Sequence, residues 1–379
     1  MKIGILTLPL HTNYGGILQA YAFQTVLERM GHEVVVIDKI ENYHVNKIVY
    51  PFIILYRIIK KVIFKDKNVQ VFRESYGNKI EPIVRKNTNI FINKYIKRLE
   101  VYKYSEITQT NQFDAIIVGS DQVWRPLYNS NIEDYFIGFD EYGDFKRIAY
   151  AASFGISSWE FDVNQTQKCS SLLKKFNAVS VREFSGADLC SNYFNVRAKV
   201  VLDPTLLLNK YDYIHLIDLS ENRASELKLF NYILDLTPVK QKIIDKISNE
   251  VQMKPFTNMA KLAATRGNYR HHLEDCISPS VTSWIKSFYD SDLVVTDSFH
   301  GCVFSIIFNK PFWVILNKER GTARFDTLLS IFNLKNRIVD INKINSINWK
   351  DKINWLEVNE ILKMKQQESF DFLIKNLKV

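Results

Sequence analysis

The stretch that decides the fold is KIGILTLPLHTNYGGILQAYAFQTVLERMGHEVVVID, from Lys2 to Asp38. Its opening KIGILTL is an apolar run typical of a buried strand. After the turn HTNYGG, apolar residues recur at helical spacing from Ile17 to Met30,. GHEVVVID then predicts a second strand. Because strand, helix and strand in this order favour two parallel strands, we expect a doubly wound α/β sheet.

The same alternation continues along the chain. FDAIIVGSDQVWRP, KRIAYAASFG, CSSLLKKFNAVSVRE and AKVVLDPTLLL complete a first Rossmann-like domain over residues 1–208,. FNYILDL restarts the pattern, and a second Rossmann-like domain is expected over residues 209–348. Residues 349–379 carry apolar positions at helical spacing and can pack back on the first domain. We therefore predict two α/β domains that face each other across a cleft.

Composition narrows the class of protein. The chain has 379 residues, 46% of them hydrophobic, which suffices for two folded cores,. Its four cysteines lie far apart without a C-x-x-C pair, so we expect reduced thiols, a cytoplasmic protein and no metal site,. The start MKIGILTLPL reads as a strand and lacks the cleavage site of a signal peptide.

The net charge of +9 belongs to one segment. Residues 41–103 hold 14 Lys and Arg against 5 Asp and Glu, and the remainder holds 36 against 36. This distribution argues against a nucleic-acid-binding protein. Within the segment, VNKIVYPFIILYRIIKKVIFKDK is too short in its uncharged run to span a bilayer. It is either a helix lying on an anionic membrane surface or a core-packed helix with a solvated basic side.

The loop HTNYGG opens the first helix and supplies four candidate substrate-binding residues, Asn13, Tyr14, Gly15 and Gly16. The two glycines permit close approach of the backbone, and a helix N-terminus offers N–H groups to an anion. A purely structural turn is the alternative. The spacing lacks G-x-G-x-x-G, so a dinucleotide-binding fingerprint is absent.

The loop GSDQVWRP follows a strand end, where open α/β sheets bind ligands,. Asp121 is a candidate base, and Ser120 is a candidate contact to substrate. Trp124 can stack on a sugar ring, and Arg125 can hold an anion. Each of these residues alone would more often be an ordinary turn residue.

In TDSFHGCVF a strand runs into a sharp turn and a helix. Asp297 and Ser298 can cap that helix, and Gly301 can form the turn, but neither role explains His300. Histidine titrates near neutral pH and suits acid–base catalysis. Together with Phe299 and the helix N-terminus, it predicts an anion site.

Cations follow the next strand in NKERGTARF. Guanidinium groups match carboxylate and phosphate geometry, and a solvated basic loop is the alternative. The candidate anion holders here are Lys318, Arg320 and Arg324. No G-x-S-x-G motif is present, which disfavours a nucleophile-elbow hydrolase.

These motifs together resemble the polysaccharide pyruvyl transferase family. The stretches that carry the resemblance occur in the family's order: NYGGILQAYAF, VGSDQVWRP, AYAASFG, SVRE, VVLDPTLLL, DLVVTDSFHGCVFSIIFNKPF and RGTARF. Arg182, within SVRE, is a candidate substrate-binding residue. The resemblance implies a glycosyltransferase-B-like pair of Rossmann-like domains. It also implies transfer of the enolpyruvyl group of phosphoenolpyruvate to two hydroxyls of a sugar, which forms a pyruvate ketal in capsule or exopolysaccharide synthesis, without a further cofactor.

Carried over residue by residue, the family's late histidine falls on His300, the implied general acid. Some members have arginine and leucine where this chain has Ser298 and Phe299. Lys318, Arg320 and Arg324 could supply the missing charge. The acceptor is expected to be a lipid-linked or oligosaccharide sugar on the first domain, with phosphoenolpyruvate on the second. A nucleotide-sugar glycosyltransferase and a non-catalytic sugar- or membrane-binding module remain alternatives.

Overall fold

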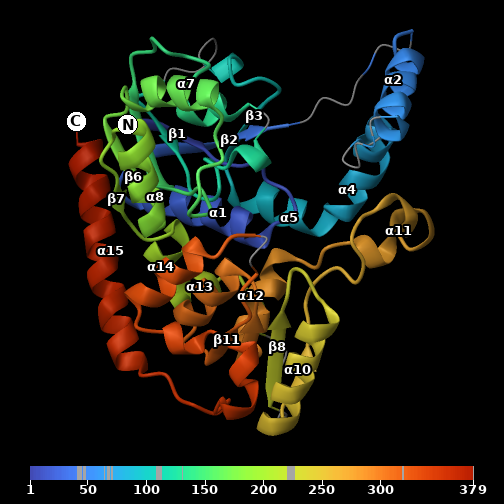
Figure 1. Ribbon diagram of the computed structural model, residues 1–379. Helices are drawn as coiled ribbons and strands as arrows, with labels where there is room; N and C mark the ends of the chain where they lie inside the picture. The colour runs from blue at the N-terminus through green and yellow to red at the C-terminus, as the bar shows by residue number, and fades with distance from the viewer. Residues whose placement is uncertain are drawn as a thin grey trace.

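The computed structural model describes residues 1–40, 45, 48–63, 65, 69, 71–107, 113–129, 131–219, 227–317 and 320–378. In this part of the chain two parallel sheets lie in two domains (Figure 1). The first sheet has the order β3-β2-β1-β4-β5-β6-β7, and the second has the order β11-β10-β8-β9. The doubly wound α/β architecture expected from the sequence is therefore confirmed, in a glycosyltransferase-B-like arrangement.

The strands are short and mostly buried, as expected for parallel sheets covered on both faces,. The first sheet comprises β1 (Lys2–Leu6), β2 (Glu33–Lys39), β3 (Arg98–Val101), β4 (Ala115–Val118), β5 (Lys146–Ala152), β6 (Ala178–Val181) and β7 (Lys199–Val200). The second comprises β8 (Lys228–Tyr232), β9 (Lys254–Phe256), β10 (Leu293–Thr296) and β11 (Phe312–Val314).

Helices connect the strands and supply the rest of both cores. They are α1 (Tyr14–Arg29), α2 (Tyr50–Val62), α3 (Arg73–Ser75), α4 (Glu81–Val84), α5 (Lys86–Tyr95), α7 (Val163–Leu173), α8 (Phe184–Leu189), α9 (Lys210–Ile214), α10 (Pro238–Val251), α11 (Arg266–His271), α12 (Val281–Asp290), α13 (Phe299–Ile307), α14 (Ala323–Ile331) and α15 (Trp355–Leu377). Shorter 3₁₀ and π turns include η1 (Tyr76–Ile80), η4 (Cys190–Phe194) and η5 (Pro204–Leu207).

Alternation along the strands sorts the apolar side chains into two layers. Ile3 and Ile5 of β1 join the core that contains α1, whereas Leu6 joins the core on the other face with Leu172 of α7,. The first of these cores continues without a break to Phe230 of β8 and to α13. The two domains therefore share apolar packing and are not held together by their linker alone.

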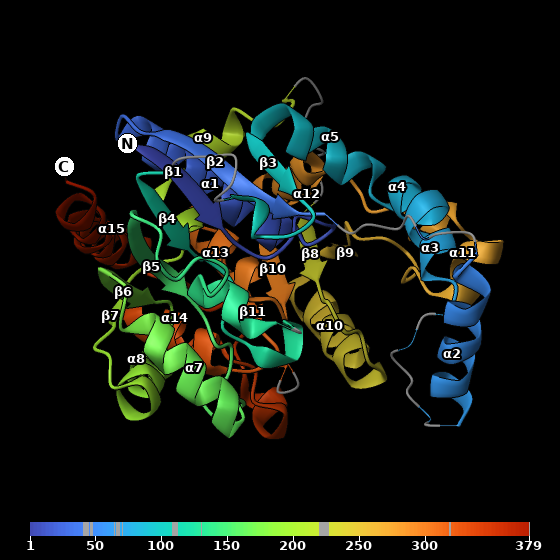
Figure 2. The ribbon, with the colours of Figure 1, turned by 90° about the horizontal axis from the view of Figure 1, so that it is seen from above.

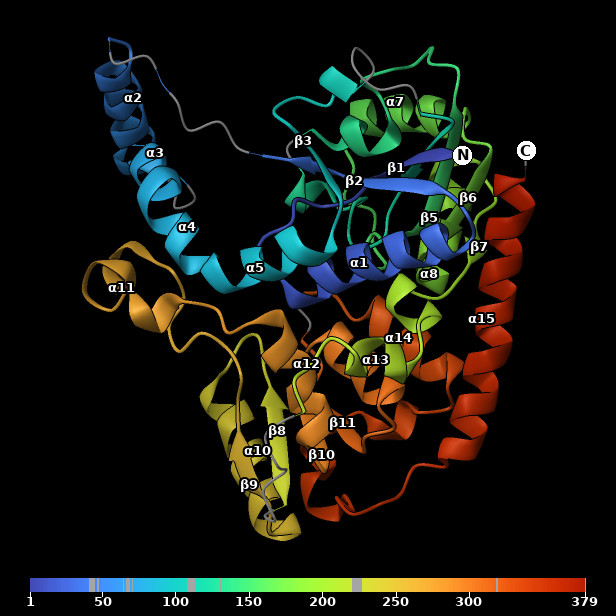
Figure 3. The ribbon, with the colours of Figure 1, turned by 180° about the vertical axis from the view of Figure 1, so that it is seen from behind.

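The long helix α15 runs beside both domains (Figures 1 and 3). Ser369 Oγ accepts a hydrogen bond from the backbone N–H of Leu202, and Gln366 donates to the carbonyl of Leu206. Phe372 packs against Tyr150, and the centroids of the two rings are 6.2 Å apart. These contacts return the C-terminal segment to the first domain.

Helix α2, in the basic segment, does not pack against the core, as one of the two expected alternatives requires. Helix α2 stands away from the sheets at the edge of the molecule (Figure 2), and none of its residues is buried. A core-packed helix with a solvated basic side is therefore the wrong description of these residues. Within the described chain, no helix combines the length and apolarity needed to cross a bilayer.

Candidate active site

A cleft of about 780 Å³ lies where the carboxyl ends of the two sheets meet. Each sheet reverses its strand order there, between β1 and β4 in the first sheet and between β8 and β10 in the second. Open α/β sheets bind ligands at such switch points because the loops on either side diverge. The predicted residues that line the cleft are Asn13, Tyr14, Asp121, Asp297, Ser298, Phe299, His300, Arg320 and Arg324.

His300 meets the glycine loop of the first domain. A methyl group added at Gly15 would lie 2.0 Å from Nδ1 of His300, so the imidazole occupies the space that a side chain would need. Gly15 is therefore required by close approach across the domain boundary, and a structural turn alone does not account for it. Tyr14 adds a second link, because its hydroxyl donates to the carbonyl of Pro279 at 2.9 Å.

The turn before His300 is built by local hydrogen bonds. Thr296 Oγ1 accepts from the N–H of Ser298 at 3.0 Å, and Ser298 Oγ accepts from the N–H of Gly301 at 3.4 Å. A methyl group at Gly301 would lie 2.1 Å from Thr296 Oγ1. Ser298 is thus the N-cap of α13, and Gly301 permits the tight entry that presents His300.

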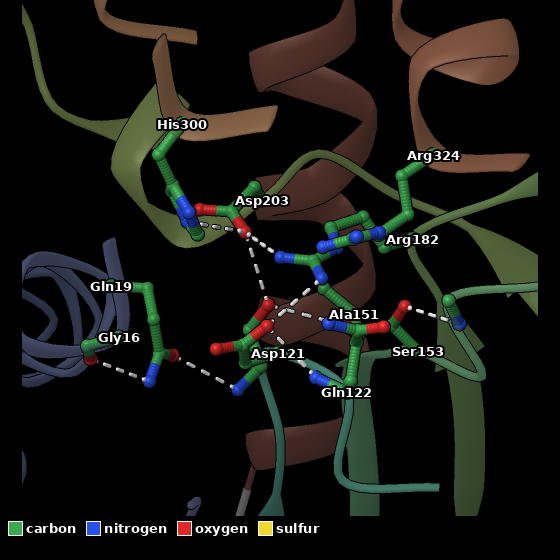
Figure 4. Close-up of polar contacts among 12 residues, drawn as sticks. Gly16, Gln19, Asp121, Gln122, Ala151, Ser153, Arg182, Asp203, His300 and Arg324 are labelled. Atoms are coloured by element: carbon green, nitrogen blue, oxygen red, sulfur yellow. Dashed lines mark hydrogen bonds and ion pairs between the residues drawn. The ribbon is translucent and has the colours of Figure 1, made fainter. Parts of the chain in front are cut away.

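Asp203 lies on the other side of the imidazole (Figure 4). Its Oδ2 is 3.7 Å from Nε2 of His300, an ion-pair distance that exceeds a hydrogen bond,. The same oxygen accepts from Arg182 Nη1 at 2.7 Å and from Ser120 Oγ at 3.2 Å. Thr205 donates to Oδ1 from both its N–H and its hydroxyl. Asp203 is therefore a fixed carboxylate behind the histidine.

Burial opposes the ionisation of Asp203, but the charges of His300 and Arg182 outweigh it. The pKa of this carboxyl is accordingly held well below its usual range,. Among the residues that the structure describes, the buried Nε2 of His300 has no hydrogen-bond partner. A buried ring nitrogen beside an ionised carboxylate is suited to hold a proton that can be given to a substrate.

Arg182 joins Asp203 to Asp121. Its Nη2 donates to Asp121 Oδ1 at 3.2 Å, and the N–H of Gln122 donates to the same oxygen at 2.9 Å. Asp121 has a positive φ of 71°, a conformation that non-glycine residues rarely adopt outside functional or tight turns,. Figure 4 shows the three charged side chains converging from separate strand ends. We call Asp121, Arg182 and Asp203 the first-domain wall.

The pairing changes the chemistry available to Asp121. Burial opposes its ionisation, yet the charges of Arg182, His300 and Arg324 prevail and lower its pKa. A carboxylate with a lowered pKa is a weak base, so the geometry favours an anchoring role over the expected proton acceptance. The pKa of Arg182 is raised, because the two carboxylates outweigh the opposing effect of burial.

The second domain contributes a different kind of arginine. Arg324 is 7% exposed and lines the cleft. Its Nη2 donates to the carbonyl of Arg320 at 3.1 Å, and its Nε has no hydrogen-bond partner within the described chain. No ion pair of Arg324 occurs among the described residues. Burial, followed by the nearby charge of Arg182, lowers its pKa to about 10. A buried cation without a carboxylate suits a bound anion.

The ring of Phe299 lies beside both guanidinium groups. The centroid of the ring is 4.5 Å from Cζ of Arg182 and 5.7 Å from Cζ of Arg324. Such contacts orient arginines without compensating their charge. Phe299 therefore holds the arginine side chains in place.

Arg320 and Asp297 are already engaged. Arg320 Nη2 donates to Asp235 Oδ1 at 2.8 Å, and Asp297 Oδ2 accepts from Lys240 Nζ at 2.6 Å. Asp297 also accepts from the N–H groups of Leu234 and Asp235. The charge of Arg320 is thus partly compensated by Asp235, and its expected role as an anion holder stays a prediction. We call His300, Arg320 and Arg324 the second-domain wall.

Two residues of the loop GSDQVWRP lie outside the cleft. Trp124 is 0% exposed, stacks on Phe136 and donates from its indole to the carbonyl of Tyr135. Arg125 is buried and pairs with Glu160. The expectations that Trp124 stacks on a sugar and that Arg125 holds an anion are therefore corrected. Both side chains stabilise the loop from behind.

Of the remaining predicted residues, two make hydrogen bonds within the protein and one lies outside the described residues. Gly16 does not line the cleft, and its carbonyl accepts from Gln19. Ser120 is buried, and its N–H donates to Gln19 Oε1 at 3.1 Å. Lys318 lies outside the described residues. Within the described part of the chain, no cluster of three His, Cys, Asp or Glu side chains could hold a metal ion.

Sequence reasoning missed Asp203, Gln19 and Lys240. Asp203 had a usable signal, because it follows the strand run of VVLDPTLLL just as Asp121 and His300 follow theirs,. Gln19 and Lys240 lie on helices. Nothing in their local pattern distinguishes them from ordinary surface positions.

Fold and site together define a two-domain, glycosyltransferase-B-like protein with a charged cleft between Rossmann-like domains. The chain belongs to the polysaccharide pyruvyl transferase family, whose model matches residues 13–319. It is accordingly a pyruvyltransferase, which confirms the expectation from its motifs.

Solved structures of similar shape are distant. A glycosyltransferase from Rickettsia africae has 10% identity and a TM-score of 0.49, with 100% of this chain and 94% of that chain covered. The S. aureus protein MnaA, solved with UDP, has 13% identity and a TM-score of 0.47, covering 98% and 90%. No curated protein sequence matches this chain. Similarity at this level carries no argument about substrate.

Proposed function

We propose that this protein transfers the enolpyruvyl group of phosphoenolpyruvate to two hydroxyls of one sugar, forming a pyruvate ketal during capsular or exopolysaccharide synthesis. The observation that carries the proposal is the buried guanidinium of Arg324 near His300 in the cleft, which makes no direct ion pair within the described residues. Phosphoenolpyruvate carries a phosphate and a carboxylate, and both match a guanidinium fork. Arg324 is the proposed anion holder of the second domain.

His300 is the proposed general acid. Protonation of C3 of phosphoenolpyruvate makes C2 electrophilic, and a sugar hydroxyl then adds to C2. The bond between C2 and the phosphate oxygen breaks, and the second hydroxyl closes the ketal ring. Of the two hydroxyl protons, one replaces the proton used at C3 and the other leaves with phosphate. Asp203 supports this step by stabilising the imidazolium while His300 holds its proton.

The acceptor sugar is proposed to lie against the first domain. Asn13 and Tyr14 line that side of the cleft, and Asp121 faces it with a carboxylate oriented by Arg182. Carboxylate and amide groups bind sugar hydroxyls by hydrogen bonds. A lipid-linked or oligosaccharide acceptor entering from this side would meet the donor at His300.

The test is phosphate release from phosphoenolpyruvate with a panel of nitrophenyl hexosides and lipid-linked sugars. We expect release that depends on an acceptor and is lost in His300→Gln. A thermal shift with UDP- or GDP-sugars but none with phosphoenolpyruvate would instead indicate a glycosyltransferase. Binding of sugar that is unchanged in His300→Gln, without any turnover, would indicate a binding module.

A further inference from the structure

Helix α2 exposes an apolar face. It projects from the first domain on the chain segment that leads through α3, η1 and α4 to α5 (Figures 1 and 3). Phe52 is 70% exposed and Val62 is 68% exposed. Surface helices of folded proteins usually turn their apolar stripe toward the core. Here the stripe faces solvent, so another surface must cover it in the working state.

The exposed apolar side chains form one continuous sector, whereas the half-buried Ile53 and Ile54 lie on the side of Arg57,. At 100° per residue the sector is about 160° wide. Its members, all exposed, are Pro51, Phe52, Leu55, Tyr56, Ile58, Ile59, Val62 and Ile63. Arg57 lies on the opposite side and donates to both oxygens of Glu74, at 2.7 and 2.8 Å. This bidentate pair fixes the basic side of the helix toward α3 and so turns the apolar side outward.

Cations border the sector. Lys60 follows Tyr56 around the helix on one edge, and Lys61 precedes Ile58 on the other,. Helix α2 contains no Asp or Glu, and residues 41–103 carry 14 basic against 5 acidic residues. Long lysine side chains beside an apolar face reach lipid phosphates while the face enters the acyl region. Charge complementarity therefore selects an anionic bilayer as the occupant.

The length of the helix fits a surface orientation. Its 13 residues span about 20 Å, less than the roughly 30 Å of a hydrocarbon core,. We propose that α2 is an interfacial helix that inserts its exposed face into an anionic membrane surface. The bilayer would then hold the cleft near a lipid-linked acceptor. This consequence rests on the proposed function, whereas membrane binding by α2 does not.

The test uses the full chain and vesicles of phosphatidylcholine with or without about 30% phosphatidylglycerol. We expect co-sedimentation with the anionic vesicles and weak binding to the neutral ones. The double variant Leu55→Glu, Ile59→Glu should reduce binding at least about tenfold, because two carboxylates would enter the acyl region. Lys60→Gln with Lys61→Gln should weaken binding to anionic vesicles and leave the neutral baseline unchanged.

Leu356→Glu is the matched control, since this leucine is 73% exposed on α15, away from α2. It should bind vesicles like the parent. Thermal unfolding checks that every variant folds. Absence of sedimentation with anionic vesicles overturns the proposal. So does a dimer in light scattering that the α2 double variant dissociates, because a second copy would then cover the face.

The two proposals fail separately. Phosphate release with a soluble hexoside needs no vesicles, and the α2 double variant should retain it. If release is absent while vesicle binding is observed, the proposed reaction fails and the membrane helix stands. If release is observed without vesicle binding, the membrane helix fails alone.

Discussion

Arg182 and Arg324 lie beside the same ring of Phe299, yet only Arg182 is paired with carboxylates. In the first-domain wall the charge of Arg182 is compensated, because Arg182 bridges the carboxylates of Asp121 and Asp203. On the second-domain wall, Arg324 is buried and makes no ion pair with any carboxylate in the described part of the chain. Similar residues in similar surroundings thus have different tasks. The paired arginine maintains the shape of the site, and the unpaired one is available to a substrate anion.

His300 joins the two walls, so its replacement should have the largest effect. We expect His300→Gln to lower turnover by about 10²- to 10⁴-fold, the usual contribution of a general acid. The fold should persist, because glutamine is polar and of similar length. Phosphate release and thermal unfolding measure the two effects. Turnover within threefold of the parent would remove His300 from the chemistry.

Arg182→Met should destabilise the fold by about 3–5 kcal/mol, because it removes the ion-pair partner that two buried carboxylates share,. Denaturant unfolding measures this loss. A variant as stable as the parent would mean that the first-domain wall is not held by its ion pairs.

Arg324→Met is the matched change on the other wall. We expect stability within about 1 kcal/mol of the parent, since the buried charge that is removed has no direct ion pair among the described residues. Affinity for phosphoenolpyruvate should fall about 10- to 100-fold, the value of one or two charge-assisted hydrogen bonds. Calorimetric titration measures the affinity. Equal losses of stability in both arginine variants would abolish the distinction between the walls.

Gly15→Ala tests the contact across the cleft. The added methyl group should displace His300 and lower kcat by about tenfold, because small misplacements of a catalytic group are costly,. Gly16→Ala is the control, since its nearest contact would be Asn13 Nδ2 at 3.2 Å. Similar kcat values for the two variants would show that the imidazole is not constrained by Gly15.

Of the effects predicted, we expect the pH dependence of thermal stability to be the smallest. The pKa of Asp121 is lowered in the fold from an ordinary value of 3.8, so its contribution to stability is present above that value and is lost as pH falls below it,. We expect Asp121→Asn to lose less thermal stability than the parent between about pH 5 and pH 3. Parallel curves for the two proteins would mean that this carboxylate is not stabilised by Arg182.

The sequence motifs predicted the position of the site better than they predicted which side chains contact one another there. Asp121 and the glycine loop come together because each follows a strand of the first sheet, and parallel strands end at one edge,. His300 follows β10 of the second sheet and meets them across the cleft. Trp124 and Arg125 follow the same strand, yet the backbone turn at Asp121 directs them into the core. A composition-based reading of that loop cannot distinguish these directions.

The sequence by itself determined the α/β alternation, the two sheets and the strand-end positions, because hydrophobic periodicity is a local property. Only the tertiary structure decided that Asp203 stands behind His300 and that Arg182 is paired while Arg324 is not. It also decided that the apolar side of α2 faces outward. These outcomes depend on strand order and on contacts between residues distant in sequence, which no local pattern encodes.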